Sequence, residues 1–291
     1  MKSGTKCRQA VALAVLMLYA IAAVPLFLLR PETVLADEAR YCADDDMYGG
    51  EGESVNDNYY IYHDYKVTRE DHSLMSAPTY SGIALNQTNI CAPVAGLNVA
   101  VYYDRYYPNL IPNFEPGMVS SGTYRYFPDI GWSQTDAAVA DLYSIMKTNQ
   151  GAAGTSNSDF KNGLVQFFGN HGYSMSYSSF YGGSATVNFS ALTAAVDQGK
   201  VGLILCSRYN FVYNIGNLDN GTTTYIVKTD SNIGHIMMVY GYMVVDYYQN
   251  GAVFQTDTFL YVSSGFSSGK QGYVLLNDYL SIDEALIVNV A

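Results

Sequence analysis

The chain is poor in charged residues, and in basic residues above all. Only 14% of its 291 residues are charged, and 15 lysines and arginines stand against 26 acidic residues, for a net charge of −11. Because no basic cluster interrupts this acidic balance and nucleic-acid phosphates repel acidic proteins, we expect no nucleic-acid partner. The four cysteines and four histidines show no metal-ligand spacing, so neither a metal nor another cofactor is expected. The length and the hydrophobic content suit one domain with terminal extensions.

A long uncharged run occurs at the N-terminus. Positive residues up to Arg8 precede residues 10–29, which carry no charge, and Val34-Leu35-Ala36 then offers the small residues that a signal peptidase reads. Residues 1–36 are therefore predicted to be a cleaved export signal of Gram-positive type, and the protein to be secreted or held at the cell surface. The alternative is an uncleaved anchor, because about twenty apolar residues span a bilayer. Membrane contact is expected only in that case.

The next stretch, residues 37–79, is polar and acidic. Asp44-Asp45-Asp46 and Gly49-Gly50 lie within it, and no periodic apolar pattern accompanies them. Such composition predicts a flexible spacer or a prosegment ahead of a folded domain at 80–291.

Within 80–291, helical patterns come first and strand patterns follow. A buried helix is predicted to begin at Cys91, with Asn89 as its cap and Pro93 in its first turn, where a missing N–H costs nothing. Further helices are predicted over 134–147, 160–168 and 190–198, and strands over 201–207, 222–228, 235–247, 258–263, 273–276 and 286–290. This order predicts an α+β fold with an antiparallel sheet.

Cleavage of the signal would leave three cysteines, an odd number in an exported protein. Cys42 and Cys206 can pair, which leaves Cys91 as a free thiol. Alternatively Cys206 is a buried strand residue and nothing is paired, which the apolar run Leu203-Ile204-Leu205 favours.

Two residues carry the candidate chemistry. A thiol is nucleophilic as the thiolate, and a helix N-terminus stabilises that anion, so Cys91 is the candidate nucleophile. Of the four histidines, His235 alone opens a long apolar strand, directly after Gly234, and it is the candidate base. Alternatively, His235 has only a structural role, as a core histidine that is satisfied by one hydrogen bond.

Two supporting roles complete such a site. The imidazole needs a partner that orients it, and Ser263 at the end of the following strand is the candidate, with Asp246 and Asp257 as fallbacks. The oxyanion needs donors, for which the Cys91 main-chain N–H and the side chain of Gln87 or Asn86 are candidates. A plain polar loop is the alternative interpretation of those two amides.

The order of these motifs resembles the papain-like cysteine peptidases, in particular the bacterial branch similar to the double-glycine leader peptidases. The resemblance runs from about residue 80 to the C-terminus and rests on Asn86-Gln87, Cys91-Ala92-Pro93, Gly234-His235, Val239-Tyr240-Gly241-Tyr242, Ser263-Ser264-Gly265-Phe266 and Gly272-Tyr273-Val274. It implies a helical lobe and an antiparallel-sheet lobe, with Cys91 as nucleophile and His235 as base. The chain departs from the family pattern at two positions. Ser263 stands where the family has Asn or Asp, and Leu85 stands where the family has the oxyanion glutamine, for which Gln87 is the nearest match.

The resemblance implies a stand-alone, monomeric exported peptidase that hydrolyses peptide bonds through a thioester. The expected partner is a peptide, or a peptide crosslink of the cell wall. Leader processing is not expected, because this chain has no transporter. The alternative function is a catalytically degenerate module for extracellular binding or adhesion, which the departure at Ser263 and the tyrosine-rich surface favour.

Overall fold

The computed structural model describes residues 33–34, 57–63, 65–72, 77–80, 85–114, 119–121, 124–126, 133–217, 223–232, 234–266 and 271–291. The predicted export signal, and Cys42 with the acidic stretch around it, lie outside these residues, apart from Thr33 and Val34. Those two residues form the short strand β1 (Thr33–Val34), which pairs with β2.

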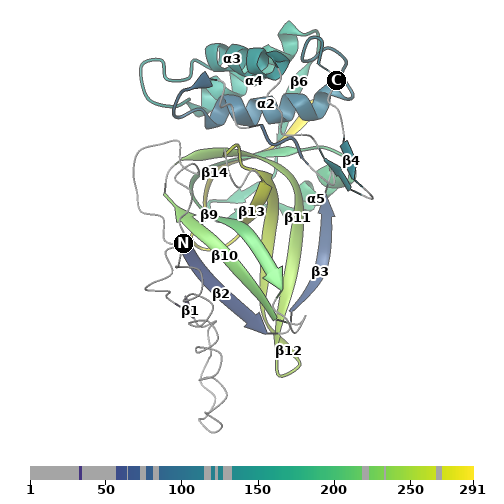
Figure 1. Ribbon diagram of the computed structural model, residues 1–291, viewed down its shortest axis with the longest axis vertical. Coiled ribbons are helices and arrows are strands. Elements are labelled where there is room, and N and C mark those ends of the chain that lie inside the picture. Colours follow the sequence, from purple (N-terminus) through teal and green to yellow (C-terminus); the bar gives the residue numbers. More distant parts are fainter. Residues whose placement is uncertain are drawn as a thin grey trace, which may run out of the picture.

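The described chain is α+β, as predicted. Figure 1 shows three helices gathered at one end of a large antiparallel sheet: α2 (Cys91–Asp104), α3 (Ser133–Ile145) and α4 (Asn157–Asn170). We call these three helices the helical layer. A fourth helix, α5 (Phe189–Asp197), lies beside the sheet, and its N-cap is Asn188, whose side chain accepts from the Ala191 N–H. The four predicted helices are therefore confirmed to within a few residues at their ends.

The sheet is built mainly from the C-terminal half of the chain. Its strands are β2 (Asp57–His63), β3 (Tyr65–His72), β6 (Met175–Ser179), β9 (Gly202–Asn217), β10 (Thr223–Ser231), β11 (His235–Gln249), β12 (Ala252–Ser263), β13 (Gln271–Leu275) and β14 (Ser281–Val290), together with β1. Short separate hairpins are formed by β4 (Val119–Ser121) with β5 (Tyr124–Tyr126), and by β7 (Tyr181–Gly183) with β8 (Thr186–Val187).

The long strand β9 closes the sheet on itself. Its first part pairs with β11, where His235 lies opposite Cys206, and its later part pairs with β13, where Tyr273 lies opposite Val212. Since β13 pairs with β12 and β12 pairs with β11, these four strands form a closed ring. The closure fixes the start of β11, and therefore His235, in the middle of hydrogen-bonded backbone.

Part of the predicted spacer belongs to this sheet. β2 pairs with β10, and β3 pairs with β11 from Tyr65 opposite Tyr247 to His72 opposite Gly241. The guanidinium of Arg69 also lies over the rings of Phe189 and Tyr242, at 5.1 and 5.3 Å. The prediction of flexibility is therefore wrong for residues 57–63 and 65–72, which form strands. In β3 the sequence signal is weak because an edge strand with several charged residues lacks a clean apolar alternation.

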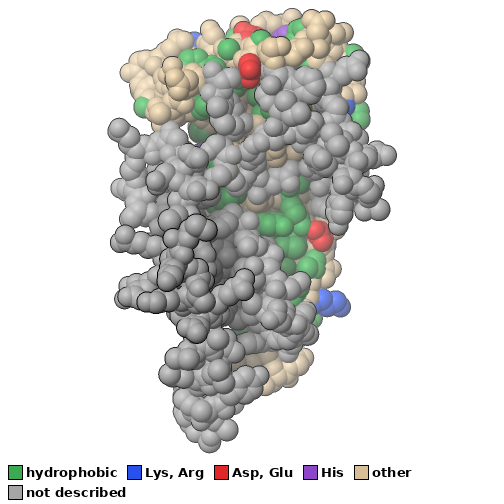
Figure 2. All heavy atoms as spheres, in the orientation of Figure 1, with side chains coloured by type: hydrophobic (Ala, Val, Ile, Leu, Met, Phe, Trp, Pro, Cys, Tyr) green, Lys and Arg blue, Asp and Glu red, His purple; other side chains and the backbone are tan. Residues whose placement is uncertain are grey.

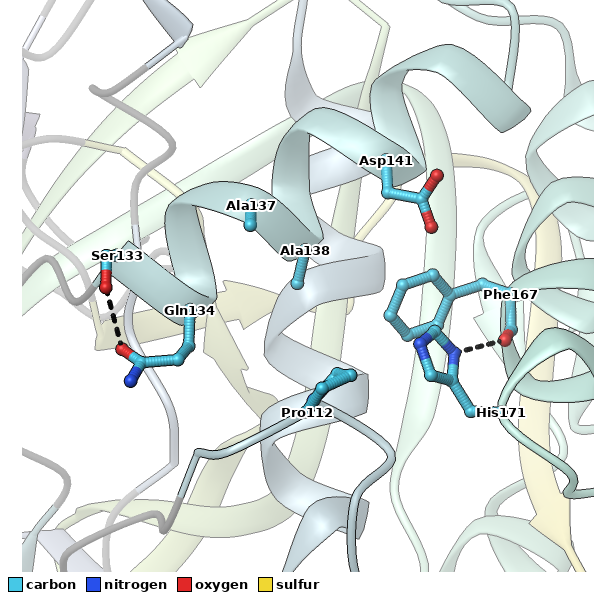
Figure 3. Close-up of a pocket in the computed structure, with 8 residues that line it drawn as sticks. All are labelled: Pro112, Ser133, Gln134, Ala137, Ala138, Asp141, Phe167 and His171. Carbon is cyan, nitrogen blue, oxygen red and sulfur yellow. Dashed lines mark hydrogen bonds between the residues drawn. The ribbon is translucent and has the colours of Figure 1, made fainter.

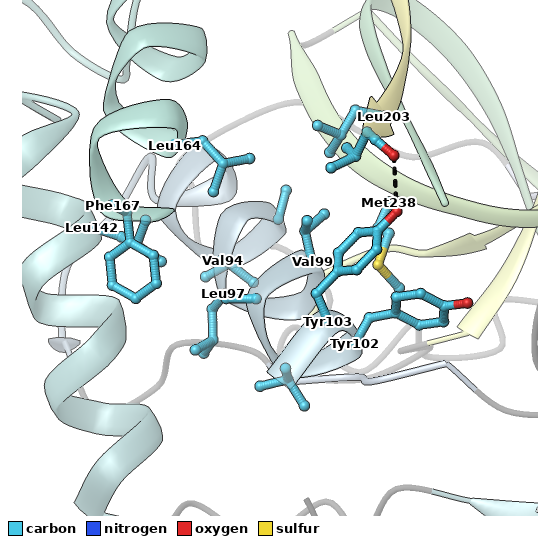
Figure 4. Close-up of a cluster of buried hydrophobic side chains, with 14 of the residues drawn as sticks. Val94, Leu97, Val99, Tyr102, Tyr103, Leu142, Leu164, Phe167, Leu203 and Met238 are labelled. Atoms are coloured by element: carbon cyan, nitrogen blue, oxygen red, sulfur yellow. Dashed lines mark hydrogen bonds between the residues drawn. The ribbon is translucent and has the colours of Figure 1, made fainter. Parts of the chain in front are cut away.

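The helical layer packs on the sheet through α2, which is buried along nearly its whole length. A helix that is apolar on all sides is one that other elements surround. Figure 4 shows Leu142, Leu164 and Phe167 on one side of α2, and Tyr103 on the sheet side near Leu203 and Met238. The Tyr103 hydroxyl donates to the Val288 carbonyl at 2.8 Å, which satisfies its one polar group. The nucleophile candidate thus begins a helix that is held from both sides.

The surface of the described residues is sparsely charged. In Figure 2 acidic and basic side chains appear singly over the described part of the face in view, and apolar side chains gather over the sheet. In the part of the chain that the structure describes, no helix combines the length and the apolarity needed to cross a bilayer.

Candidate active site

Cys91 is the first residue of α2 and part of its surface reaches solvent. The N-cap is Ile90, and no side chain caps the helix. Asn89, predicted as the cap, instead adopts a φ of 55°, and its amide donates to the Thr88 hydroxyl. Because no N-cap side chain bonds to this helix end, its first main-chain N–H groups can stabilise an anion there.

The sulfur of Cys91 lies against main-chain N–H groups from two elements. The N–H groups of Cys91 and Ala92 come from the helix, and that of Ile236 comes from β11. Since Ile236 follows His235, the start of α2 lies next to the start of the strand that carries the predicted base.

His235 begins β11, and its ring is oriented through one nitrogen. Its Nε2–H donates to the main-chain carbonyl of Ser264 at 2.7 Å. This bond fixes the tautomer in which Nδ1 is unprotonated. Nδ1 is therefore the nitrogen left to accept a proton.

Aromatic rings hold the imidazole plane. Phe266 stacks on it with centroids 4.6 Å apart and planes 8° apart, and Tyr209 stacks at 5.7 Å and 27°. Phe211 in turn meets Phe266 edge to face at 5.4 Å. These contacts restrict the ring to one orientation, a role for which sequence reasoning did not single out Tyr209 or Phe266. Phe266 stands in the motif after β12, which is the signal that points to it.

Ser263 does not orient the imidazole. Its hydroxyl is buried and donates to the Pro78 carbonyl at 2.5 Å, while the carbonyl of the neighbouring Ser264 accepts the hydrogen bond from the imidazole N–H. The prediction was one residue early because it looked for a side-chain acceptor, whereas the acceptor is the main-chain carbonyl of the next residue. The fallback carboxylates lie far along β11 and β12: Asp246 accepts from Thr256, and Asp257 accepts from Gln255.

Gly265 sets the position of the Ser264 carbonyl. It has a φ of +77°, and a Cβ at this residue would lie 2.8 Å from Cγ1 of Val94, which is on the first turn of α2. The glycine therefore permits both the turn and the close approach of this loop to the nucleophile helix. The loop that orients the base rests directly on the helix that carries the thiol.

A buried segment, residues 77–80, connects the same two elements from the other side. Asn98 of α2 is fully buried; its Oδ1 accepts from the Tyr80 N–H at 2.9 Å and its Nδ2 donates to the Tyr80 carbonyl at 3.1 Å. Two residues earlier, Pro78 receives the Ser263 hydroxyl. The segment thus spans from the nucleophile helix to the end of β12.

The candidate oxyanion amides precede the helix. Asn86 and Gln87 are both exposed, in the loop that leads to Cys91, and Asn86 has a φ of 45°. The structure therefore places them close in the chain to the nucleophile and directs neither into the core.

Burial disfavours the charged forms of both Cys91 and His235. Burial raises the pKa of the Cys91 thiol above its ordinary 9.0, and the three N–H groups oppose that effect only in part. Burial lowers the pKa of His235 from 6.5 to about 4, against the opposing hydrogen bond to Ser264. Both shifts favour the neutral forms, in which an imidazole can act as a base and a thiol can give up its proton to one.

A separate pocket of about 350 Å³ lies on the helical layer and is lined by neither Cys91 nor His235. Figure 3 shows His171 beneath the Phe167 ring, with Nδ1 bonded to the Phe167 carbonyl at 2.8 Å, and Asp141 on the facing helix. His171 is the C-cap of α4. Cys206, the residue opposite His235 in the pairing of β9 with β11, is a free, buried thiol, and burial raises its pKa. Among the described residues, no cluster of three His, Cys, Asp or Glu side chains is arranged to bind a metal.

Comparison with known proteins returned no relative: no family model, no curated protein and no solved structure matches the chain. Function therefore has to be inferred from the site itself.

Proposed function

We propose that the protein is an exported cysteine peptidase with a papain-like two-lobe arrangement. The proposal is supported by the occurrence of three features at the start of α2 and β11. Cys91 lies at an uncapped helix N-terminus, the Ile236 N–H contacts its sulfur, and His235 is fixed through Nε2 so that Nδ1 remains as a base. The helical layer on a closed antiparallel sheet fits that architecture.

The chemistry is thiol acyl transfer. Nδ1 of His235 takes the Cys91 proton as the sulfur attacks an amide carbonyl, and the N–H groups at the start of α2 stabilise the charge that develops on the oxygen. The amine leaves with the proton from the imidazole, and water then hydrolyses the thioester with His235 again as base. A main-chain carbonyl in place of a carboxylate orients the ring without adding a charge. We propose a peptide, or a cell-wall peptide crosslink, as substrate, acted on outside the cell by a monomer.

The test uses quenched fluorescent peptide libraries and purified cell-wall peptide, incubated with the secreted protein. Hydrolysis by wild type and by Cys206→Ala, and none by Cys91→Ala or His235→Ala, is the expected result. Hydrolysis that survives in Cys91→Ala would reject Cys91 as the nucleophile.

The second candidate is a binding or adhesion module without catalysis. It is favoured by the raised pKa of Cys91 and the lowered pKa of His235, since both shifts oppose a thiolate–imidazolium pair at rest. In that case the peptide binds equally to wild type and Cys91→Ala, and remains uncut by both.

A further inference from the structure

Asn149 closes a turn in the helical layer and also reaches out of it. It follows α3 with a φ of 59°, a conformation that asparagine tolerates better than most residues. Its main-chain N–H donates to the Gly154 carbonyl at 2.7 Å, and its Oδ1 accepts from the Gly154 N–H at 2.7 Å. These reciprocal bonds fix the orientation of the Asn149 side chain, because the turn holds its Oδ1.

The nitrogen end of the same amide holds the loop before the nucleophile. Nδ2 donates to the Thr88 carbonyl at 2.9 Å and lies 3.3 Å from the Tyr143 hydroxyl. Thr88 is three residues before Cys91. Asn149 therefore joins the body of the helical layer to residues 85–90.

That loop carries the amide side chains closest in the chain to the nucleophile. Asn86, Gln87 and Asn89 flank Thr88, all three are exposed, and Asn86 and Asn89 both have positive φ. Leu85 and Ile90 pack against the core at the two ends of the loop, but residues 86–89 between them are exposed, so a bond from a rigid turn has a large effect on where their donors point.

We propose that Asn149 is a positioning residue, which holds the loop 85–90 so that its amide donors and the first N–H groups of α2 face the oxyanion. The inference rests on the proposed peptidase function. Asn149 does not touch the reacting atoms; it acts through the Thr88 carbonyl.

The test variant is Asn149→Asp. It keeps an oxygen for the Gly154 N–H and tolerates the same φ, but it replaces the donor to Thr88 with a second acceptor. Asn113→Asp is the matched control: it makes the same charge change at an exposed residue of positive φ in the helical layer.

Two thiol probes separate the roles. Iodoacetamide reports the reactivity of Cys91. A panel of N-acetyl dipeptide aldehydes reports the oxyanion donors, because the sulfur adds to the aldehyde carbon while the thiol proton passes to its oxygen. We expect Asn149→Asp to keep the wild-type alkylation rate at Cys91 and to bind the best aldehyde roughly tenfold more weakly, about the effect of one hydrogen bond. Asn113→Asp should match wild type with both probes.

Unchanged aldehyde affinity in Asn149→Asp would overturn the proposal. A parallel fall in alkylation, aldehyde binding and melting temperature would overturn it too, since Asn149 would then be a structural residue only. If wild type is alkylated at Cys91 but forms no adduct with any aldehyde, the peptidase function itself fails, and the role of Asn149 fails with it.

Discussion

The contact between Gly265 and Val94 joins the loop that orients His235 to the helix that carries Cys91. Gly265→Ala perturbs this contact in two ways. A non-glycine residue at a φ of +77° costs about 1–2 kcal/mol, and the added Cβ would lie 2.8 Å from Cγ1 of Val94, an overlap that costs about 1–3 kcal/mol. The two effects together predict a loss of about 2–5 kcal/mol in the free energy of unfolding.

Gly151→Ala is the control, because Gly151 has a φ of +86° and open space where the Cβ would go. It should show only the backbone cost. The difference between the two variants in urea unfolding isolates the Val94 contact. It should shrink when Gly265→Ala is made in a Val94→Ala background, since that change removes the clashing methyl group.

The same variant tests the link to function. Relief of the overlap has to move the loop away from α2, which lengthens the 2.7 Å bond between His235 and the Ser264 carbonyl. Cys91 alkylation should therefore slow in Gly265→Ala and not in Gly151→Ala. Equal stability and equal alkylation in the two variants would refute the view that this loop is pinned on the nucleophile helix.

Two further predictions concern stability. Asn98→Ala leaves the buried N–H and carbonyl of Tyr80 without their partners, so the free energy of unfolding, measured in urea, should fall by about 2 kcal/mol or more. The control, Gln87→Ala, changes an exposed side chain, and its free energy of unfolding should stay within about 0.5 kcal/mol of wild type. Equal effects of the two substitutions would show that α2 does not hold residues 77–80. The pKa of His235 is 6.5 in the unfolded chain and about 4 in the folded protein, so protonation favours the unfolded chain, and wild type should lose stability as the pH falls from 6.5 to 4. His235→Gln should lose less stability over the same pH range. Parallel plots of unfolding free energy against pH for the two proteins would contradict the lowered pKa.

The sequence predicted those elements whose periodicity and end signals agree. The apolar run after Cys91, with Pro93 in its first turn, identified α2 and its start. The strands β2 and β3 were missed because sheet pairing, which sequence alone does not reveal, holds an acidic and weakly patterned segment in place.

The site was predictable where side chains carry the chemistry and not where main chain does. Cys91 and His235 stand out by residue type and by position in their elements. The Ser264 carbonyl has no signature of its own, since every residue has one, and Gly265 is the nearest clue to it. The bond from Asn149 to Thr88 joins residues 61 apart in the chain, which no local pattern can show.

The most direct test of the Cys91–His235 pair is alkylation of Cys91 by iodoacetamide across pH, in wild type and in His235→Ala, with the labelled peptide identified by mass spectrometry. The predicted result is a rate at neutral pH that is higher in wild type than in His235→Ala and that falls in wild type as His235 is protonated toward pH 4. A profile in both proteins that follows an ordinary thiol, with a pKa of about 8.5, would contradict the pair and leave the binding module as the better account.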